Sequence, residues 1–211
     1  MIPQHIIIFG ATGGTGRALL QQALDRGHRV TAFVRDPARL SRQHARLTVA
    51  IGDVLQPDTL PPALQGQDAV LCALGRNPFV NEPVCSAGTR NVLNEMTRQG
   101  IRPIIVETAM GVSDSLQQSG VFQKFLFQTL LRSYYADKKI QERYVRESNL
   151  DWTIVRPVRL TNGPLTDTLQ ASTTVQFQGF DAPSVSRADV ARFMLDQLDT
   201  PTFRHQCPIL Y

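Results

Sequence analysis

The feature that most constrains this chain is an apolar strand that runs directly into a glycine-rich turn. Residues 6–9 form an unbroken apolar run, which is typical of a central parallel strand covered on both faces. Gly10, Gly13 and Gly16 follow at three-residue spacing, and residues 17–24 continue at helical period. Gly10 permits the sharp exit from the strand, Gly13 lets the backbone approach a pyrophosphate, and Gly16 lets the helix pack close to the sheet. The strand, turn and helix therefore predict a dinucleotide site at the helix N-terminus, where free N–H groups face the phosphates.

Apolar runs alternate with helical stretches along most of the 211 residues. This alternation predicts a single α/β domain over residues 1–211, built on a doubly wound parallel sheet. The expected strands after the first cover residues 29–34, 47–51, 69–74, 104–106, 152–155 and a stretch near 175–177. The expected helices cover residues 58–64, 84–99 and 188–198. An amphipathic stretch over residues 121–148 is interpreted as one helix, or as two helices that break near Ser133.

Charge and composition argue against several other classes of protein. The net charge of +4 is spread along the chain without a basic block, so we expect no nucleic-acid partner. No apolar run has the length of a membrane span, and residues 1–4 lack the basic residues of a secretory signal. The three cysteines and four histidines lack the spacing of a disulfide framework or a metal site. We therefore expect a cytoplasmic protein, monomeric or homodimeric, with no metal and no membrane partner.

Basic residues at the end of the second expected strand indicate which nucleotide binds. Folds specific for NAD usually place an acid there, which bonds the 2′-hydroxyl of the adenine ribose. This chain has Arg35, whose guanidinium suits a 2′-phosphate, and Arg17 and Arg39 add positive charge nearby. Asp36 is also within reach of a ribose, and an ordinary surface pair that starts a turn is the alternative interpretation. The sequence thus favours NADP(H) over NAD(H).

Residues that follow the other expected strands complete a candidate cofactor site. Asp53 can accept a hydrogen bond from the adenine amine, and Val54 can pack against the adenine ring. The small residues between Ala73 and Gly75 leave room beside the pyrophosphate and ribose. Pro157 and Val158 follow the sixth strand and are expected to wall the nicotinamide pocket. The Gly-Asp dipeptide is also common in turns, so each stretch alone is weak evidence for a cofactor site. The stretches support one another because they follow successive expected strands.

Several short motifs together resemble one family of oxidoreductases. They are residues 10–16 (GATGGTG), 34–36 (VRD), 52–56 (GDVLQ), 66–70 (GQDAV), 74–77 (LGRN) and 186–190 (SRADV). They are similar to the NAD(P)-binding, NmrA-like atypical short-chain dehydrogenases/reductases, and especially to the biliverdin-IX beta reductase/flavin reductase family. The resemblance covers nearly the whole chain, and it implies a Rossmann-type fold with NADPH as hydride donor. It also implies an open pocket, built from the C-terminal part of the chain, for a planar acceptor such as a flavin, quinone or bilin. The cofactor contacts predicted from residues and resemblance are Gly10, Thr12, Gly13, Gly14, Thr15, Gly16, Arg35, Asp53, Val54, Ala73, Leu74, Gly75, Arg76, Thr108, Lys138, Pro157 and Val158.

Two stretches of the sequence are candidates for catalysis. Similar reductases place a serine where Ala109 stands, so Thr108 is the nearest hydroxyl after the fifth strand, and Glu107 is an unusual acid there. Tyr134 and Lys138 show the Tyr-x-x-x-Lys spacing of short-chain dehydrogenases, and an overlapping pair repeats it one residue later. On a helix this spacing places the ammonium beside the phenol and lowers the phenol pKa. We expect Lys138 to contact the cofactor and Thr108 or Tyr134 to act in proton transfer; a strand-end cap and a solvated helix face are the alternatives.

These observations predict an NADPH-dependent oxidoreductase that transfers hydride to a planar acceptor. Because a flavin acceptor needs no acid from the protein, such an enzyme tolerates an alanine at position 109. The main alternative is a non-catalytic NADP(H) sensor of the NmrA-like type, which acts through a protein partner. A nucleotide-sugar epimerase is disfavoured, because it needs more chain after the sixth strand than this sequence has.

Overall fold

The computed structural model describes residues 3–40, 42–75, 82–118, 131–175, 177 and 183–211. Its main sheet has the strand order β3-β2-β1-β4-β5-β6-β10-β8, in which all neighbours are parallel except β10 and β8. The longer strands are β1 (His5–Phe9), β2 (Arg29–Val34), β3 (Leu47–Ile51), β4 (Ala69–Cys72), β5 (Pro103–Glu107) and β6 (Asp151–Pro157). The shorter strands are β7 (Arg159–Thr161), β8 (Ala171–Ser172), β9 (Ser184–Ser186) and β10 (Ile209–Leu210), and β7 pairs with β9 in a separate small sheet. This is the predicted doubly wound Rossmann-type fold.

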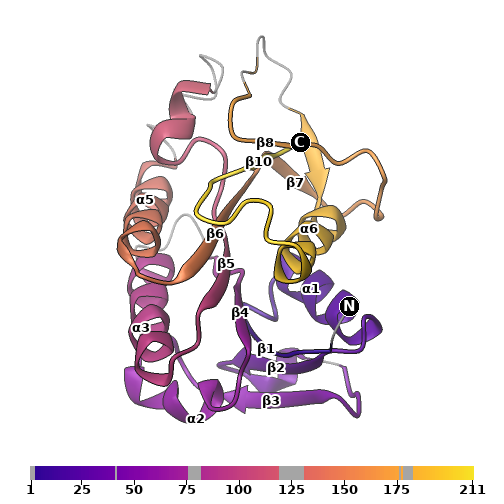
Figure 1. Ribbon diagram of the computed structural model, residues 1–211, viewed down its shortest axis with the longest axis vertical. Helices are drawn as coiled ribbons and strands as arrows, with labels where there is room; N and C mark the ends of the chain where they lie inside the picture. The colour runs from indigo at the N-terminus through magenta and orange to yellow at the C-terminus, as the bar shows by residue number, and fades with distance from the viewer. Residues whose placement is uncertain (1–2, 41, 76–81, 119–130, 176, 178–182) are drawn as a thin grey trace.

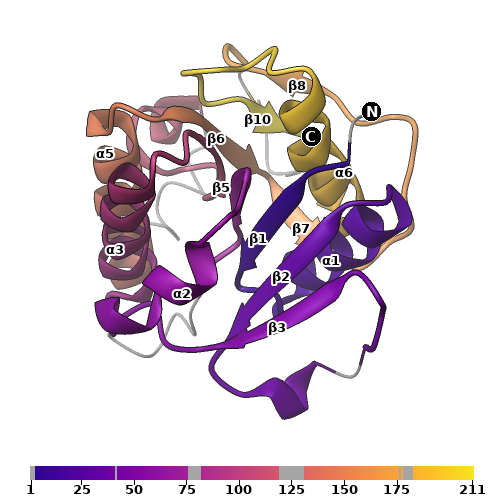
Figure 2. The same cartoon turned by 60° about the horizontal axis from the view of Figure 1, so that its bottom comes forward.

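Helices cover both faces of the sheet. The pair α1 (Gly14–Asp25) and α6 (Arg187–Asp199) lies on one face, and the pair α3 (Val84–Gln99) and α5 (Arg132–Glu147) lies on the other (Figure 1). The same separation is visible in the turned view, where β3 forms the front edge of the sheet (Figure 2). The remaining helices among the described residues are short: α2 (Pro61–Leu64) and the 3-10 turns η1 (Pro37–Arg39), η2 (Pro57–Thr59) and η3 (Ser113–Gln118).

The unbroken apolar run of β1 follows from these two helical layers. Ile6 and Ile8 pack in the core beneath α1 and α6, whereas Ile7 and Phe9 pack in the core beneath α3. Side chains alternate between the two faces of a strand, and here both faces are fully buried. The apolar run therefore places β1 at the centre of the sheet, and the glycine turn that follows it lies at the carboxyl edge.

Two element predictions needed correction. The expected strand near 175–177 is wrong, because Val175 and Phe177 lie in no strand, and residue 176 is outside the described residues. The strand forms earlier, at β8, because Ala171 and Ser172 pair antiparallel with β10. The expected helix over 58–64 is divided into η2 and α2, because Pro61 and Pro62 supply no backbone N–H to continue the first turn.

The amphipathic stretch over 121–148 is observed only in its second half, as α5. Residues 119–130 are outside the described residues, so the choice between one helix and two stays a prediction. Within the described ranges, no helix combines the length and the apolar character that crossing a bilayer requires.

Candidate functional site

A cavity of about 600 Å³ runs along the carboxyl edge of the sheet, where parallel α/β sheets place their ligands. Residues from the ends of β1 to β5, the start of α1, α5 and α6 line it. The predicted residues that it brings together are Gly10, Thr12, Gly13, Gly14, Thr15, Arg35, Asp53, Val54, Ala73, Leu74, Gly75, Thr108, Tyr134 and Lys138. Such a volume is ordinary for a small-molecule site.

Three predicted contacts do not line this cavity, and a fourth lies outside the described residues. Gly16 lies beneath the glycine turn, and Pro157 and Val158 belong to the end of β6 and the residue after it. Arg76 falls in the range 76–81, which the structure does not describe. The assignment of these residues to the cofactor stays a prediction.

The glycine turn leaves no space for side chains at its two ends. Gly10 has φ of +81°, and a Cβ added there would lie 2.3 Å from the Ala73 carbonyl oxygen. A Cβ on Gly16 would lie 2.0 Å from the Gly10 carbonyl oxygen. Gly13 is the N-cap of α1 but provides no side-chain cap, so the first amides of α1 keep their donors for another partner. The turn is therefore built to let an anionic group approach the backbone.

Positive charge marks one end of the cavity. Arg35 follows β2 directly, and Arg39 closes η1, so both guanidinium groups lie beside the same edge of the sheet. The sequence left open whether Asp36 reaches the ribose. In the structure its carboxylate accepts a hydrogen bond from Ala38 N at 3.0 Å and caps η1. Neither Asp36 nor Arg17 lines the cavity. The arrangement suits an extra phosphate at this end.

A turn after β3 shapes the floor beside these arginines. The Asp53 carboxylate accepts a hydrogen bond from Leu55 N at 3.0 Å, which holds the turn in place. Gly52 makes room for an aromatic ring, because a Cβ there would lie 2.4 Å from Cζ of Phe33. Sequence reasoning did not single out Phe33 or Gly52 as binding residues, although both line the cavity. The sequence could have indicated them by position, because Phe33 lies near the end of β2 and Gly52 directly follows β3.

Lys138 lies at the other end of the cavity and joins two strand ends. Its ammonium donates to the carbonyl oxygens of Leu74 and Glu107, both at 3.1 Å, and the residue is only 2% exposed. Burial works against the charged form, but Tyr134, Cys85 and Glu107 outweigh it, so the pKa of Lys138 is raised and the group stays an ammonium. An ammonium has three donors, and these two carbonyl bonds leave one for the cavity.

The structure distinguishes the two overlapping Tyr-x-x-x-Lys pairs. Lys138 Nζ lies 5.8 Å from the ring centroid of Tyr134, and both residues line the cavity. In the second pair, Tyr135 donates its hydroxyl to the Met110 carbonyl oxygen at 3.3 Å, and Lys139 is exposed. Burial raises the pKa of Tyr135. The first pair therefore lines the cavity and the second does not, and the catalytic role of the first pair stays a prediction.

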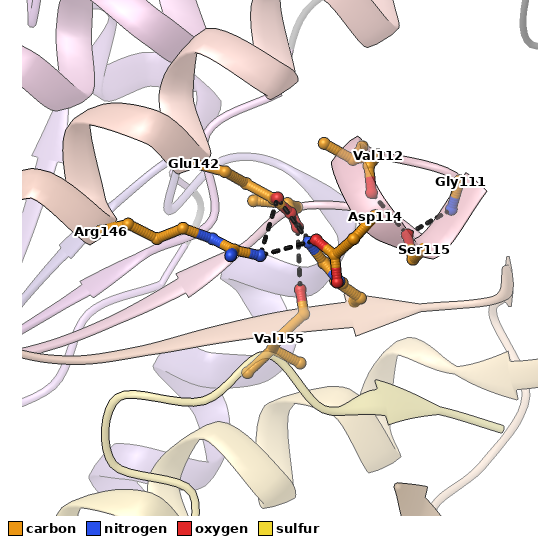
Figure 3. Close-up of polar contacts among 9 residues, drawn as sticks. Gly111, Val112, Asp114, Ser115, Glu142, Arg146 and Val155 are labelled. Carbon is orange, nitrogen blue, oxygen red and sulfur yellow. Dashed lines mark hydrogen bonds and ion pairs between the residues drawn. The ribbon is translucent and has the colours of Figure 1, made fainter. Parts of the chain in front are cut away.

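Thr108 belongs to a buried polar network that sequence reasoning did not foresee. Its hydroxyl donates to Glu142 Oε1 at 2.8 Å. Arg156 donates to both oxygens of Glu142, at 2.9 and 2.7 Å, and to both oxygens of Asp114. Figure 3 shows Glu142, Asp114 and Arg146 converging between α5, η3 and β6. Thr108 lines the cavity, but its hydroxyl proton is committed to this buried network, so the hydroxyl can offer a ligand only an acceptor.

Two further cavity residues were not assigned to the site from the sequence. Arg187 starts α6 and lies over the glycine turn, since a Cβ on Gly14 would lie 2.5 Å from its Nε. Glu107 ends β5 and accepts a hydrogen bond from the Thr15 hydroxyl at 2.9 Å. The sequence showed Arg187 only as part of the motif at residues 186–190, and it showed Glu107 only as an unusual acid. The residues that these two side chains contact are distant in sequence, so no local pattern assigned them to the site. Arg187 and Glu107, together with the uncapped amides of α1 and with Arg35, form a site whose charges and hydrogen-bonding groups fit a nicotinamide dinucleotide.

Comparison with known proteins agrees with this geometry. An uncharacterised chloroplast protein of Arabidopsis thaliana is 31% identical over 173 residues, which are 77% of this chain and 61% of that protein. The photosystem II assembly factor Ycf39 of Synechocystis is 28% identical over 160 residues, which are 72% of this chain and 44% of that protein. This chain thus spans less than two thirds of the length of either relative. Among solved structures, the anaerobilin reductase ChuY of Escherichia coli O157:H7 has a TM-score of 0.81 and 25% identity, covering 98% of this chain and 96% of ChuY.

The family model that matches this chain covers the glycine turn, the cavity and all of α6. It is the model of the NAD(P)H-binding family, and the match extends over residues 10–201. This chain therefore belongs to the NAD(P)H-binding family of Rossmann-type proteins.

Proposed function

We propose that this protein is an NADPH-dependent reductase that transfers hydride to a planar acceptor such as a flavin, quinone or bilin. The observation that carries the proposal is that a single cavity joins the arginines after β2 to Lys138, Thr108 and Tyr134. A cofactor with its 2′-phosphate at Arg35 places its other end among these three side chains. The similarity to the bilin-reducing ChuY supports an acceptor of this class.

In this proposal the residues of this chain bind and orient the nucleotide, and one of them supplies a proton. The nucleotide supplies the hydride when it is bound. The uncapped amides of α1 bind its phosphates, the remaining donor of Lys138 holds a hydroxyl at the far end, and Thr108 accepts a hydrogen bond there. Tyr134, beside the Lys138 ammonium, is the hydroxyl placed to act as an acid.

The test is reduction of a panel of acceptors by the purified protein, followed as loss of NADPH absorbance. We expect turnover with at least one free flavin, quinone or linear tetrapyrrole, and no turnover with a small aliphatic aldehyde. Tight NADP(H) binding without NADPH oxidation across the whole panel would instead favour the sensor. That alternative draws support from Ala109, where similar reductases have a serine, and from the likeness to an assembly factor.

Replacing Arg35 with alanine should weaken NADPH binding by about 10–100-fold, because charge-assisted bonds to a phosphate contribute about 1.5–3 kcal/mol. NADH lacks the 2′-phosphate, so its affinity should change less than about threefold. Arg35→Glu should widen the difference, since it adds repulsion. Titration of nucleotide fluorescence measures both affinities. Arg17→Ala is the matched control, because Arg17 is exposed and lies outside the cavity. Equal losses for both nucleotides in Arg35→Ala would refute the assignment of the 2′-phosphate to this arginine.

A further inference from the structure

Glu107 is a buried carboxyl group with one anchored oxygen and one oxygen left over. It is 7% exposed, ends β5 and lines the cavity. Its Oε1 accepts the hydrogen bond from Thr15, while Oε2 has no hydrogen-bond partner among the described residues. Oε2 is not among the side-chain atoms that are both fully buried and unpartnered, so it keeps some exposure at the cavity wall, where a ligand can reach it.

The sheet places the end of β5, which carries Glu107, three strands away from the end of β2, which Arg35 follows, in the order β2-β1-β4-β5. Neighbouring strands lie about 4.8 Å apart, so the two positions are separated by about 14 Å across the sheet. A dinucleotide whose adenosine phosphate meets Arg35 therefore extends its nicotinamide toward Glu107.

Several charged or titratable groups from different elements face Glu107. Burial raises the pKa of its carboxyl, whereas Lys138 from α5, the Thr15 hydroxyl and Arg187 from α6 lower it, and burial prevails. Cys72, from the neighbouring β4, is fully buried and its own pKa is raised, so it adds no charge. The pKa of Glu107 therefore lies above its ordinary value, and a further positive charge nearby would lower it.

We propose that Glu107 contacts the nicotinamide end of the bound nucleotide and that its protonation follows the oxidation state of that nucleotide. It keeps its proton beside the neutral, reduced ring and gives it up beside the cationic, oxidised ring. An opposite charge within about 4–6 Å lowers the pKa of a carboxyl by about 1–3. The inference rests on the proposed binding of NADP(H), but it does not require that the protein turn over any acceptor.

The consequence is a proton-linked preference between the two forms of the nucleotide. Between the two pKa values of Glu107, affinity for NADP⁺ relative to NADPH should rise about tenfold for each unit of increasing pH. The 2′-phosphate titrates in both nucleotides alike, so it cancels from this ratio. During hydride transfer, Glu107 would release its proton into the same cavity in which the acceptor is reduced.

The experiment is isothermal titration of the protein with NADP⁺ and with NADPH across pH 5–9, in pairs of buffers of different ionisation enthalpy. We expect NADP⁺ binding to release up to about one proton more than NADPH binding. Glu107→Gln keeps an oxygen for the Thr15 hydroxyl but cannot titrate, so it should abolish the difference and flatten the affinity ratio against pH. Glu82→Gln is the matched control, since Glu82 is an exposed acid of the same cavity and its loss should leave the difference intact.

The outcomes separate this inference from the proposed function. If both nucleotides bind with identical proton counts, or if the difference persists in Glu107→Gln, the inference is wrong while nucleotide binding stands. If neither nucleotide binds to the folded wild-type protein, the reductase and the inference both fail. Far-UV circular dichroism of each variant establishes that it is folded, and the wild-type pH series tests the inference without any variant.

Discussion

Gly16→Ala is expected to raise the dissociation constant for NADPH by about 10–100-fold and to lower the free energy of unfolding by about 1–3 kcal/mol. The added Cβ would lie 2.0 Å from the Gly10 carbonyl oxygen, which is backbone and cannot turn aside as a side chain can. The turn must therefore open, and overpacking of this kind costs about 1–3 kcal/mol. Each lost hydrogen bond between a backbone amide and a charged phosphate costs about 1.5–3 kcal/mol more in binding.

Urea unfolding and nucleotide titration measure the two effects of Gly16→Ala separately. Gly163→Ala is the control, because its nearest neighbour would be Thr161 Oγ1 at an ordinary 3.5 Å and it lies outside the cavity. We expect its stability within about 0.5 kcal/mol of the wild type and its NADPH affinity unchanged. Wild-type affinity in a folded Gly16→Ala protein would mean that the nucleotide does not bind at the start of α1.

Arg156→Met is expected to cost about 3–5 kcal/mol of unfolding free energy, which is the largest stability loss that we predict. The side chains of Arg156 and Glu142 are each 1% exposed, and their ion pair has an N–O distance of 2.7 Å. Removing the guanidinium leaves the Glu142 carboxylate buried, and Arg146 at 3.9 Å is then its remaining ion-pair partner in the described part of the chain. An unpaired buried charge is expensive because the protein interior solvates it poorly.

Two comparison variants make the Arg156→Met result specific to the buried pair. Arg156→Met combined with Glu142→Gln removes both charges and keeps an oxygen for the Thr108 hydroxyl, so it should recover most of the loss in urea unfolding. Arg102→Met breaks an ion pair with Asp151 in which the arginine is 59% exposed, and it should cost less than about 1 kcal/mol. Similar small losses from Arg156→Met and Arg102→Met would show that the buried network contributes little.

The predictions that succeeded from sequence were those with a local cause. The apolar run of β1, the helical period of α1 and α3, and the glycine turn follow from side chains within a few residues of one another. Spacing on one helix also explains why Tyr134 and Lys138 lie together, since residues four apart share a face. The strand expected near 175–177 failed because β8 depends on β10, about 40 residues later in the chain, and no local pattern encodes that pairing.

The chemistry at the far end of the cavity depends on contacts between distant parts of the chain. Thr15 and Glu107 are 92 residues apart, and Thr108 and Glu142 are 34 apart, yet each pair shares a hydrogen bond. Sequence reasoning identified Lys138, but not that two of its donors hold the strand ends of β4 and β5. Which donors and acceptors remain for a ligand is decided only once these partners are known.

By itself, the sequence determined the class of fold, the glycine turn at the start of α1, and the arginine that follows β2. Each of these depends on the backbone freedom, periodicity or charge of neighbouring residues, which a linear chain already contains. Only the tertiary structure decided that the Thr108 hydroxyl donates to Glu142, that Arg187 covers the turn, and that Glu107 keeps one oxygen unpartnered among the described residues. Burial, charge balance and hydrogen-bond partners are properties of packed surfaces, and those surfaces form when the strands and helices assemble.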